Sequence, residues 1–133
     1  MRKLDRTILC GILLFLAVGL IYPGLMGIFN SSMQYHGLIA QNIDALNQLK
    51  SFYSLLLAIG LIALWCSHKP EKKKDLIIAL GLIMVLSAIS RGYSLIFDGM
   101  PSTMTVVYLI VELLLAIIFI SLPSLSLLQE PEE

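Results

Sequence analysis

DLIIALGLIMVLSAISRGYSLIF (residues 75–97) and TMTVVYLIVELLLAIIFISLPSL (residues 103–125) are two long apolar stretches, separated only by DGMPS (residues 98–102). Each exceeds the ~20 residues that an α-helix needs to cross ~30 Å of hydrocarbon. A strand of a membrane β-barrel would be about half as long and would alternate in polarity, which neither stretch does. The segment therefore predicts two membrane-spanning helices joined by a short turn.

Two more apolar stretches lie upstream, at about residues 7–29 and 49–66. Apolar residues make up 58% of the 133-residue chain and charged residues 14%, and the mean hydropathy is +0.89. A soluble domain of this size carries more charge. Because hydrocarbon offers the backbone no hydrogen bonds, helices that satisfy their own are the simplest way to cross it. We predict an all-α fold, an integral membrane bundle of four transmembrane helices in antiparallel up-down topology, forming one domain over residues 1–133.

The first stretch contains helix-breaking residues. It follows basic residues, as a signal peptide does, but it is long and runs through Tyr22-Pro23-Gly24 without a small-residue cleavage site. We therefore expect an uncleaved span. Pro23 either kinks this helix or ends its regular part early. The small residues Gly19, Gly24 and Gly27 let a neighbouring helix approach closely, and packing is the interpretation that we favour.

Lysine and arginine placement predicts the orientation. Basic residues lie before the first stretch and between the second and third, at Arg2, Lys3, Arg6, Lys69, Lys72, Lys73 and Lys74. The segments 30–47 and 98–102 contain none. Positive residues stay on the cytoplasmic side, so both termini are expected there. The lysine run is expected to contact anionic lipid headgroups of the bilayer, and we predict no nucleic-acid partner.

Residues 30–47 form the one substantial segment on the outer side. Four of its apolar residues, Leu38, Ile39, Ile43 and Leu46, could form an amphipathic turn. They belong either to an amphipathic lid over the outer end of the bundle or to a plain connecting loop.

Arg91 and Glu112 lie inside the third and fourth stretches. A charged side chain at the bilayer centre costs roughly 2.5–3.5 kcal/mol on insertion scales. Such a residue is therefore expected either to pair with an opposite charge or to have a function. Arg91 would lie ~9 Å from the end of its helix near Phe97, and Glu112 ~13 Å from the matching end near Thr103. An arginine side chain can span that difference. The sequence therefore predicts an ion pair in the outer half of the bundle.

Further polar residues follow at helical spacings near the same level. They are Ser87, Ser94 and Asp98 on the face of Arg91, Thr105 and Tyr108 on the face of Glu112, and Asn47, Lys50, Ser51 and Ser54 at the start of the second span. Three such stripes predict a polar chamber. Its supporting residues are Ser87, Ser94, Asp98, Tyr108, Lys50 and Ser54, although Lys50 and Asp98 are close enough to the interface to snorkel into headgroups.

The sequence lacks the residue patterns that a shared metal site or a catalytic triad would require. His36 is expected outside and His68 inside, so they cannot share a metal ion, and no histidine lies at the depth of Ser87 to form a triad. Cys10 and Cys66 fall near the cytoplasmic face, where thiols stay reduced. An enzyme would have to use Glu112 as its acid or base, which is a weak case. We predict no catalytic residue, no metal site and no cofactor.

The run RGYSLIFDGMP (residues 91–101), followed by ELL (residues 112–114), resembles a bacterial family of small four-helix membrane proteins, the domain of unknown function 4345. The family pattern has an arginine–glycine step late in the third helix, an Asp-Gly-x-Pro turn and a glutamate in the fourth helix. It also has a basic residue at the start of the second helix, where this chain has Lys50, followed by small residues, which Ser54 and Gly60 match more loosely. The resemblance implies a bacterial inner-membrane location, marks Arg91, Asp98 and Glu112 as the signature, and implies no activity.

Two function classes fit these residues. The first is a non-enzymatic membrane protein that binds a small anionic or lipid-like ligand, or that serves as an accessory subunit of a larger membrane complex. The second is a proton-coupled transporter that works as a homo-oligomer, since four short helices enclose little volume. Because an arginine partner favours the ionised form of a carboxylate, the pair counts against proton coupling and favours the first class. A third interpretation is a purely structural ion pair that sets helix register.

Overall fold

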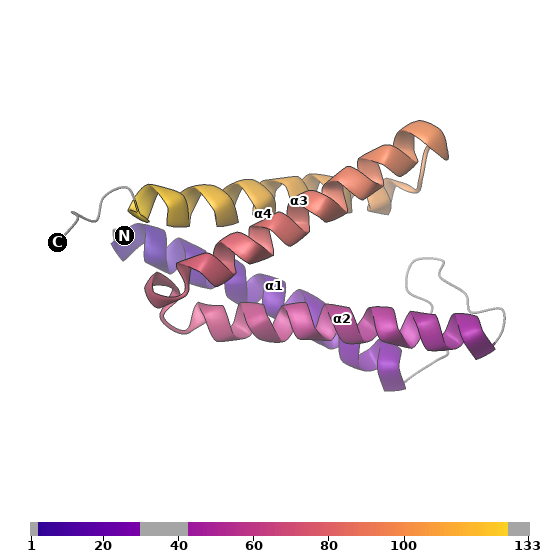
Figure 1. Cartoon of the computed structure of the whole chain (residues 1–133), viewed down its shortest axis with the longest axis horizontal. Coiled ribbons are helices and arrows are strands. Elements are labelled where there is room, and N and C mark those ends of the chain that lie inside the picture. Colours follow the sequence, from indigo (N-terminus) through magenta and orange to yellow (C-terminus); the bar gives the residue numbers. More distant parts are fainter. Residues whose placement is uncertain (1–2, 30–42, 128–133) are drawn as a thin grey trace. The chain divides into compact units, whose positions relative to one another are not determined.

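The computed structural model describes residues 3–29 and 43–127. It contains four long helices, α1 (Lys3–Phe29), α2 (Ile43–Ser67), α3 (Lys74–Phe97) and α4 (Thr103–Leu127), and a short 3-10 helix, η1 (Pro70–Lys72) (Figure 1). No strand occurs within these two ranges. Each long helix is long and apolar enough to cross a membrane. The predicted all-α class with four spans is therefore confirmed.

The helix ends differ most from the prediction at α2, which begins at Ile43 rather than near residue 49. Hydropathy marks only the part of a helix that suits hydrocarbon, and residues 43–48 are more polar. Asp44 lies in the first turn of α2, where the helix dipole stabilises a carboxylate. Because α2 begins at Ile43, both Ile43 and Leu46 of the predicted lid belong to this helix. The rest of the predicted lid, residues 30–42, lies outside the described residues.

Contacts divide the chain into two compact units. One unit contains Met1–Leu9 and Lys69–Glu133, and thus η1 and the α3–α4 hairpin. The other contains Cys10–His68, and thus most of α1 together with α2. A single domain over residues 1–133, and the up-down order of all four helices within one bundle, stay predictions.

Small residues let α1 and α2 pack closely. A Cβ atom on Gly24 would come 2.9 Å from both Cβ and the backbone nitrogen of Leu57, and one on Gly27 would overlap the ring of Tyr53. These contacts run in opposite directions along the two helices, so α1 and α2 are antiparallel. The packing role expected for Gly24 and Gly27 is confirmed, whereas Gly19 faces open space. Pro23 does not end the helix early, because α1 continues to Phe29.

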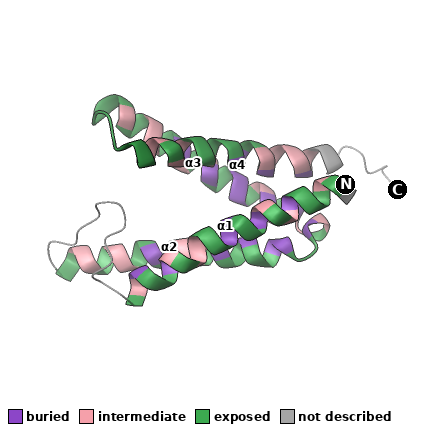
Figure 2. Ribbon diagram, turned by 180° about the vertical axis from the view of Figure 1, so that it is seen from behind, coloured by how far each residue is buried: buried purple, intermediate pink, exposed green. Residues whose placement is uncertain are grey.

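Figure 2 shows exposed residues along all four helices, and many of them are large and apolar. Phe15 on α1, Trp65 on α2, Leu86 on α3 and Ile117 on α4 are examples, and the side chain of Phe15 is 74% exposed. Water-soluble monomers rarely expose apolar surface on this scale, whereas lipid tails solvate it without cost. This exposure, together with the four membrane-compatible helices, is that of a multi-pass membrane protein.

The helices α3 and α4 form the second antiparallel pair (Figure 1). Gly81 early in α3 lies against Phe119 and Ile120 late in α4, where a Cβ atom on the glycine would come 2.7 Å from Ile120 Cγ1. Later in α3, Arg91 contacts Glu112, which comes earlier in α4. Phe119 is fully buried, so the half of the hairpin away from the turn is held by apolar packing.

The turn between α3 and α4 depends on a glycine. The backbone N–H of Asp98 donates to the carbonyl of Ser94 at 2.8 Å, which closes the last turn of α3. Gly99 follows with a φ of +102°, a conformation that residues with a Cβ atom adopt at a cost. On the other side, the carbonyl of Ser102 accepts from the backbone N–H of Thr105 at 3.0 Å and so starts α4.

Replacing Gly99 by alanine is expected to lower the free energy of unfolding by about 1 kcal/mol, because alanine is strained at positive φ. Gly92→Ala is the matched control, since Gly92 lies within α3 and a Cβ atom there meets nothing within 4 Å. Alanine inside a helix is favoured over glycine by up to about 1 kcal/mol, so the control should stabilise the protein. Unfolding in dodecyl sulfate measures both, and a shift of the same sign in the two variants would contradict the assignment of the turn.

Candidate ligand-binding site

Arg91 on α3 and Glu112 on α4 form an ion pair within one unit. Arg91 Nε lies 2.9 Å from Glu112 Oε2 and 3.1 Å from Oε1, so a single N–H is shared between both carboxylate oxygens. The ion pair expected from the sequence is thus present, and its role is a separate question. The two opposite charges cancel, which lowers the cost of keeping them at membrane depth.

The direction of the two helices explains why the pair meets despite its offset along the hairpin. A Cα–Cβ bond in a helix tilts toward the helix N-terminus. The N-terminus of α3 lies away from the turn at residues 98–102, so the side chain of Arg91 leans away from that turn. The N-terminus of α4 adjoins the turn, so the side chain of Glu112 leans toward it. The two side chains therefore converge between the levels of their Cα atoms.

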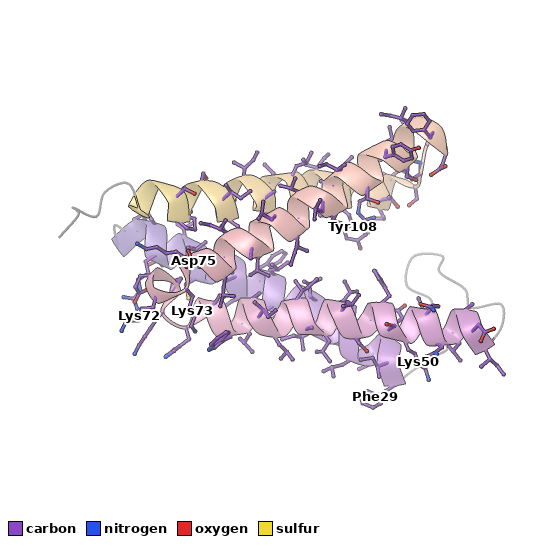
Figure 3. The ribbon with its side chains drawn as sticks, viewed as in Figure 1. Phe29, Lys50, Lys72, Lys73, Asp75 and Tyr108 are labelled. Atoms are coloured by element: carbon purple, nitrogen blue, oxygen red, sulfur yellow. The ribbon has the colours of Figure 1, made fainter. Side chains whose placement is uncertain are left out.

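Two further side chains complete the cluster. Ser87 Oγ, one turn before Arg91 on α3, donates to Glu112 Oε1 at 2.9 Å. Tyr108, labelled in Figure 3, lies one turn before Glu112 on α4. Its ring centroid is 5.9 Å from Arg91 Cζ, at the outer limit of a cation–π interaction. Glu112 thus accepts from two side chains, and an aromatic ring borders its arginine partner.

The guanidinium of Arg91 uses only part of its hydrogen-bonding capacity. An arginine has five N–H donors in a rigid planar fork, and the contact with Glu112 uses the one on Nε. Within residues 3–29 and 43–127, Nη1 and Nη2 contact no hydrogen-bond acceptor. The side chain of Arg91 is 36% exposed, compared with 16% for Glu112. The site therefore leaves Nη1 and Nη2 of Arg91 accessible, while Glu112 balances the charge of the guanidinium and fixes its orientation.

A comparison with protein families places the chain. The sequence model described as Domain of unknown function (DUF4345) matches residues 8–122. The chain belongs to the DUF4345 family. The match runs from α1 to α4 and includes the ion pair and the turn, which confirms the resemblance seen in the sequence. No curated protein and no solved structure matches this DUF4345 chain.

Ser94 and Asp98, expected to support the site, lie nearer the turn. Both are exposed, and they are linked by the backbone bond that ends α3. In the described part of this DUF4345 chain, neither side chain contacts Arg91 or Glu112. Asp98 therefore has an observed position at the end of α3, and its participation in the site stays a prediction.

Lys50, which Figure 3 labels on α2, and Ser54 belong to the other unit. Ser54 Oγ donates to the carbonyl of Lys50 at 3.0 Å, within α2 itself. This bond satisfies the serine locally, as a hydroxyl can at membrane depth. A role for these two residues beside the ion pair stays a prediction.

Apolar side chains flank the cluster, and no sequence pattern pointed to them. Met104 and Val111 lie four residues before and three residues after Tyr108, so they share its stripe on α4. Both are exposed, Met104 by 53% and Val111 by 36%. Their spacing from Tyr108 was available in the sequence, but an apolar residue in an apolar helix gives no signal until a polar site beside it is known.

Proposed function

We propose that this DUF4345 protein is a binding protein rather than an enzyme, and that it holds a small anionic or lipid-like ligand at Arg91. One observation carries the proposal: among the described residues, the hydrogen bonds between Glu112 and the guanidinium all come from Nε. The two terminal nitrogen atoms can then donate a parallel pair of hydrogen bonds to a carboxylate or a phosphate, the geometry for which arginine is suited. Glu112 orients the guanidinium, and Ser87 holds Glu112.

A purely structural ion pair would be expected to use more of the N–H donors of the arginine. The strongest arginine–carboxylate contact is bidentate, with two parallel N–H···O bonds. A charge at membrane depth is costly, so donors without an acceptor there add to the cost. The contact through one nitrogen therefore suits a site in which a second acceptor binds the remaining N–H donors. We propose that this second acceptor is the ligand.

Arg91→Gln is expected to remove a bound molecule that the wild-type protein retains when it is gently extracted, with a loss of affinity of about tenfold or more. Native mass spectrometry measures the retained mass and so reports the chemistry of the ligand. Arg6→Gln is the matched control, because it removes the same charge from a second arginine–glutamate pair, Arg6 with Glu71 at 3.4 Å, in which the arginine side chain is 55% exposed. Identical spectra from wild type and a stable Arg91→Gln variant would refute the proposal.

We further propose that the protein lies in a bacterial inner membrane with both termini in the cytoplasm. The proposal rests on the family resemblance and on the basic residues near α1 and η1. In a background with Cys10 and Cys66 replaced by alanine, Met100→Cys should react with an impermeant maleimide on intact cells. Lys72→Cys should react only after permeabilisation. Both sites are exposed, so the reverse pattern would show the opposite orientation.

A further inference from the structure

We infer that the ligand of the Arg91 site is an amphiphile, an apolar chain that ends in a carboxylate or a phosphate. This inference rests on the proposed function and adds the ligand class. Three features of the α3–α4 hairpin support it: the free end of the guanidinium, the stripe of side chains beside it, and the depth of the ion pair.

The free end of the guanidinium selects the head of the ligand. Nη1 and Nη2 have no acceptor in the described part of the chain, and their outward N–H bonds are parallel and coplanar. A group with two oxygen atoms on one carbon or phosphorus atom matches this spacing. A single hydroxyl would leave one of the two nitrogen atoms without an acceptor. Carboxylate and phosphate share the required chemistry.

The side chains beside the guanidinium suit an apolar chain. Met104, Tyr108 and Val111 follow at spacings of four and three on α4, so they form one stripe. The ring of Tyr108 lies next to Arg91 Cζ, and both flanking side chains are exposed. The next residue along the stripe, Leu115, is buried, so the accessible part ends there. A small inorganic anion would use none of this stripe, whereas the first carbon atoms of a chain could lie along it.

The depth of the ion pair also favours an amphiphile. Counting along the helices, Arg91 and Glu112 lie ~9 Å and ~13 Å from the ends that flank the turn. A small free anion would have to leave water entirely to reach this level, which is costly. An amphiphile is already concentrated in the bilayer by its chain, and its head needs to move only a short way below the headgroups.

The test compares four probes on protein purified in maltoside micelles: decanoate, decyl phosphate, acetate and decanol. Native mass spectrometry of wild type should show decanoate or decyl phosphate binding at least about tenfold more tightly than acetate or decanol. Arg91→Gln should lose this difference, and Arg6→Gln should keep it. The ratio between decanoate and decyl phosphate distinguishes a carboxylate head from a phosphate head.

The outcomes separate the two proposals. If acetate binds wild type as tightly as decanoate and Arg91→Gln abolishes both, the anion site stands and the amphiphile inference is overturned. If no anion binds, or if decanoate binds wild type and Arg91→Gln equally, both proposals are overturned. Should Arg91→Gln fail to fold, Met104→Ser and Val111→Ser at exposed positions take its place. They should weaken decanoate binding several-fold and leave acetate unchanged, and equal effects on both probes would overturn the inference.

Discussion

Replacing Glu112 by leucine is expected to lower the free energy of unfolding by about 3 kcal/mol, at the low end of the range for breaking a buried ion pair. The change leaves the guanidinium of Arg91 without its carboxylate contact in the described part of the chain, and it removes the acceptor of Ser87 Oγ. The low end applies because the side chain of Arg91 is 36% exposed. Unfolding by dodecyl sulfate in mixed micelles measures the loss.

Two further variants show what the ion pair contributes. Glu112→Gln keeps an acceptor for Ser87 and should cost less than Glu112→Leu. The double variant Arg91→Leu/Glu112→Leu should recover most of the loss, since two apolar side chains need no partner in hydrocarbon. A stable double variant without bound ligand would assign the pair to binding. A double variant as unstable as Glu112→Leu would instead assign the pair to the fold and would count against the proposed function.

Gly27→Val is expected to destabilise the α1–α2 pair by about 3 kcal/mol, the upper part of the range for overpacking. A Cβ atom at this position would overlap the ring of Tyr53, which is only 2% exposed and therefore has no space into which to move. Either α1 and α2 must separate or the ring must leave its buried position. The same unfolding measurement reports the loss.

Gly19→Val is the matched control for this prediction. It makes the same chemical change on the same helix, but a Cβ atom at Gly19 meets nothing within 4 Å, so the effect should stay within about 0.5 kcal/mol. Tyr53→Ala in the Gly27→Val background makes room for the new side chain and should recover part of the loss. Equal losses in the two glycine variants would show that something other than contact with Tyr53 causes the loss.

The four spans could be predicted from the sequence because hydropathy and length are local properties. The stretches predicted at 75–97 and 103–125 match α3 (Lys74–Phe97) and the start of α4 (Thr103–Leu127) within a few residues. The start of α2 could not, because hydropathy does not distinguish a polar helical turn at the membrane surface from a loop. Residues 43–48, which begin α2, are more polar than the rest of that helix.

The candidate site could be predicted in part. Charge at membrane depth is rare, so Arg91 and Glu112 stood out in the sequence. Helical spacing placed Ser87 on the face of Arg91 and Tyr108 on the face of Glu112. The stripe that included Ser94 and Asp98 was less informative, because spacing says which face a residue lies on but not how far along the helix a contact reaches. Those two residues are exposed and lie nearer the turn, at the end of α3, and their part in the site stays a prediction.

By itself, the sequence determined that this DUF4345 protein is an all-helical membrane protein with four spans and two opposite charges at similar depth. These properties follow from composition, length and spacing along the chain. Only the tertiary structure decided that Glu112 engages Arg91 through Nε alone, that Ser87 completes the contact, and that Gly27 accommodates the ring of Tyr53. The physical reason is that donor geometry and close packing depend on the distance and orientation between two helices. The periodicity of either helix alone does not encode that distance or orientation.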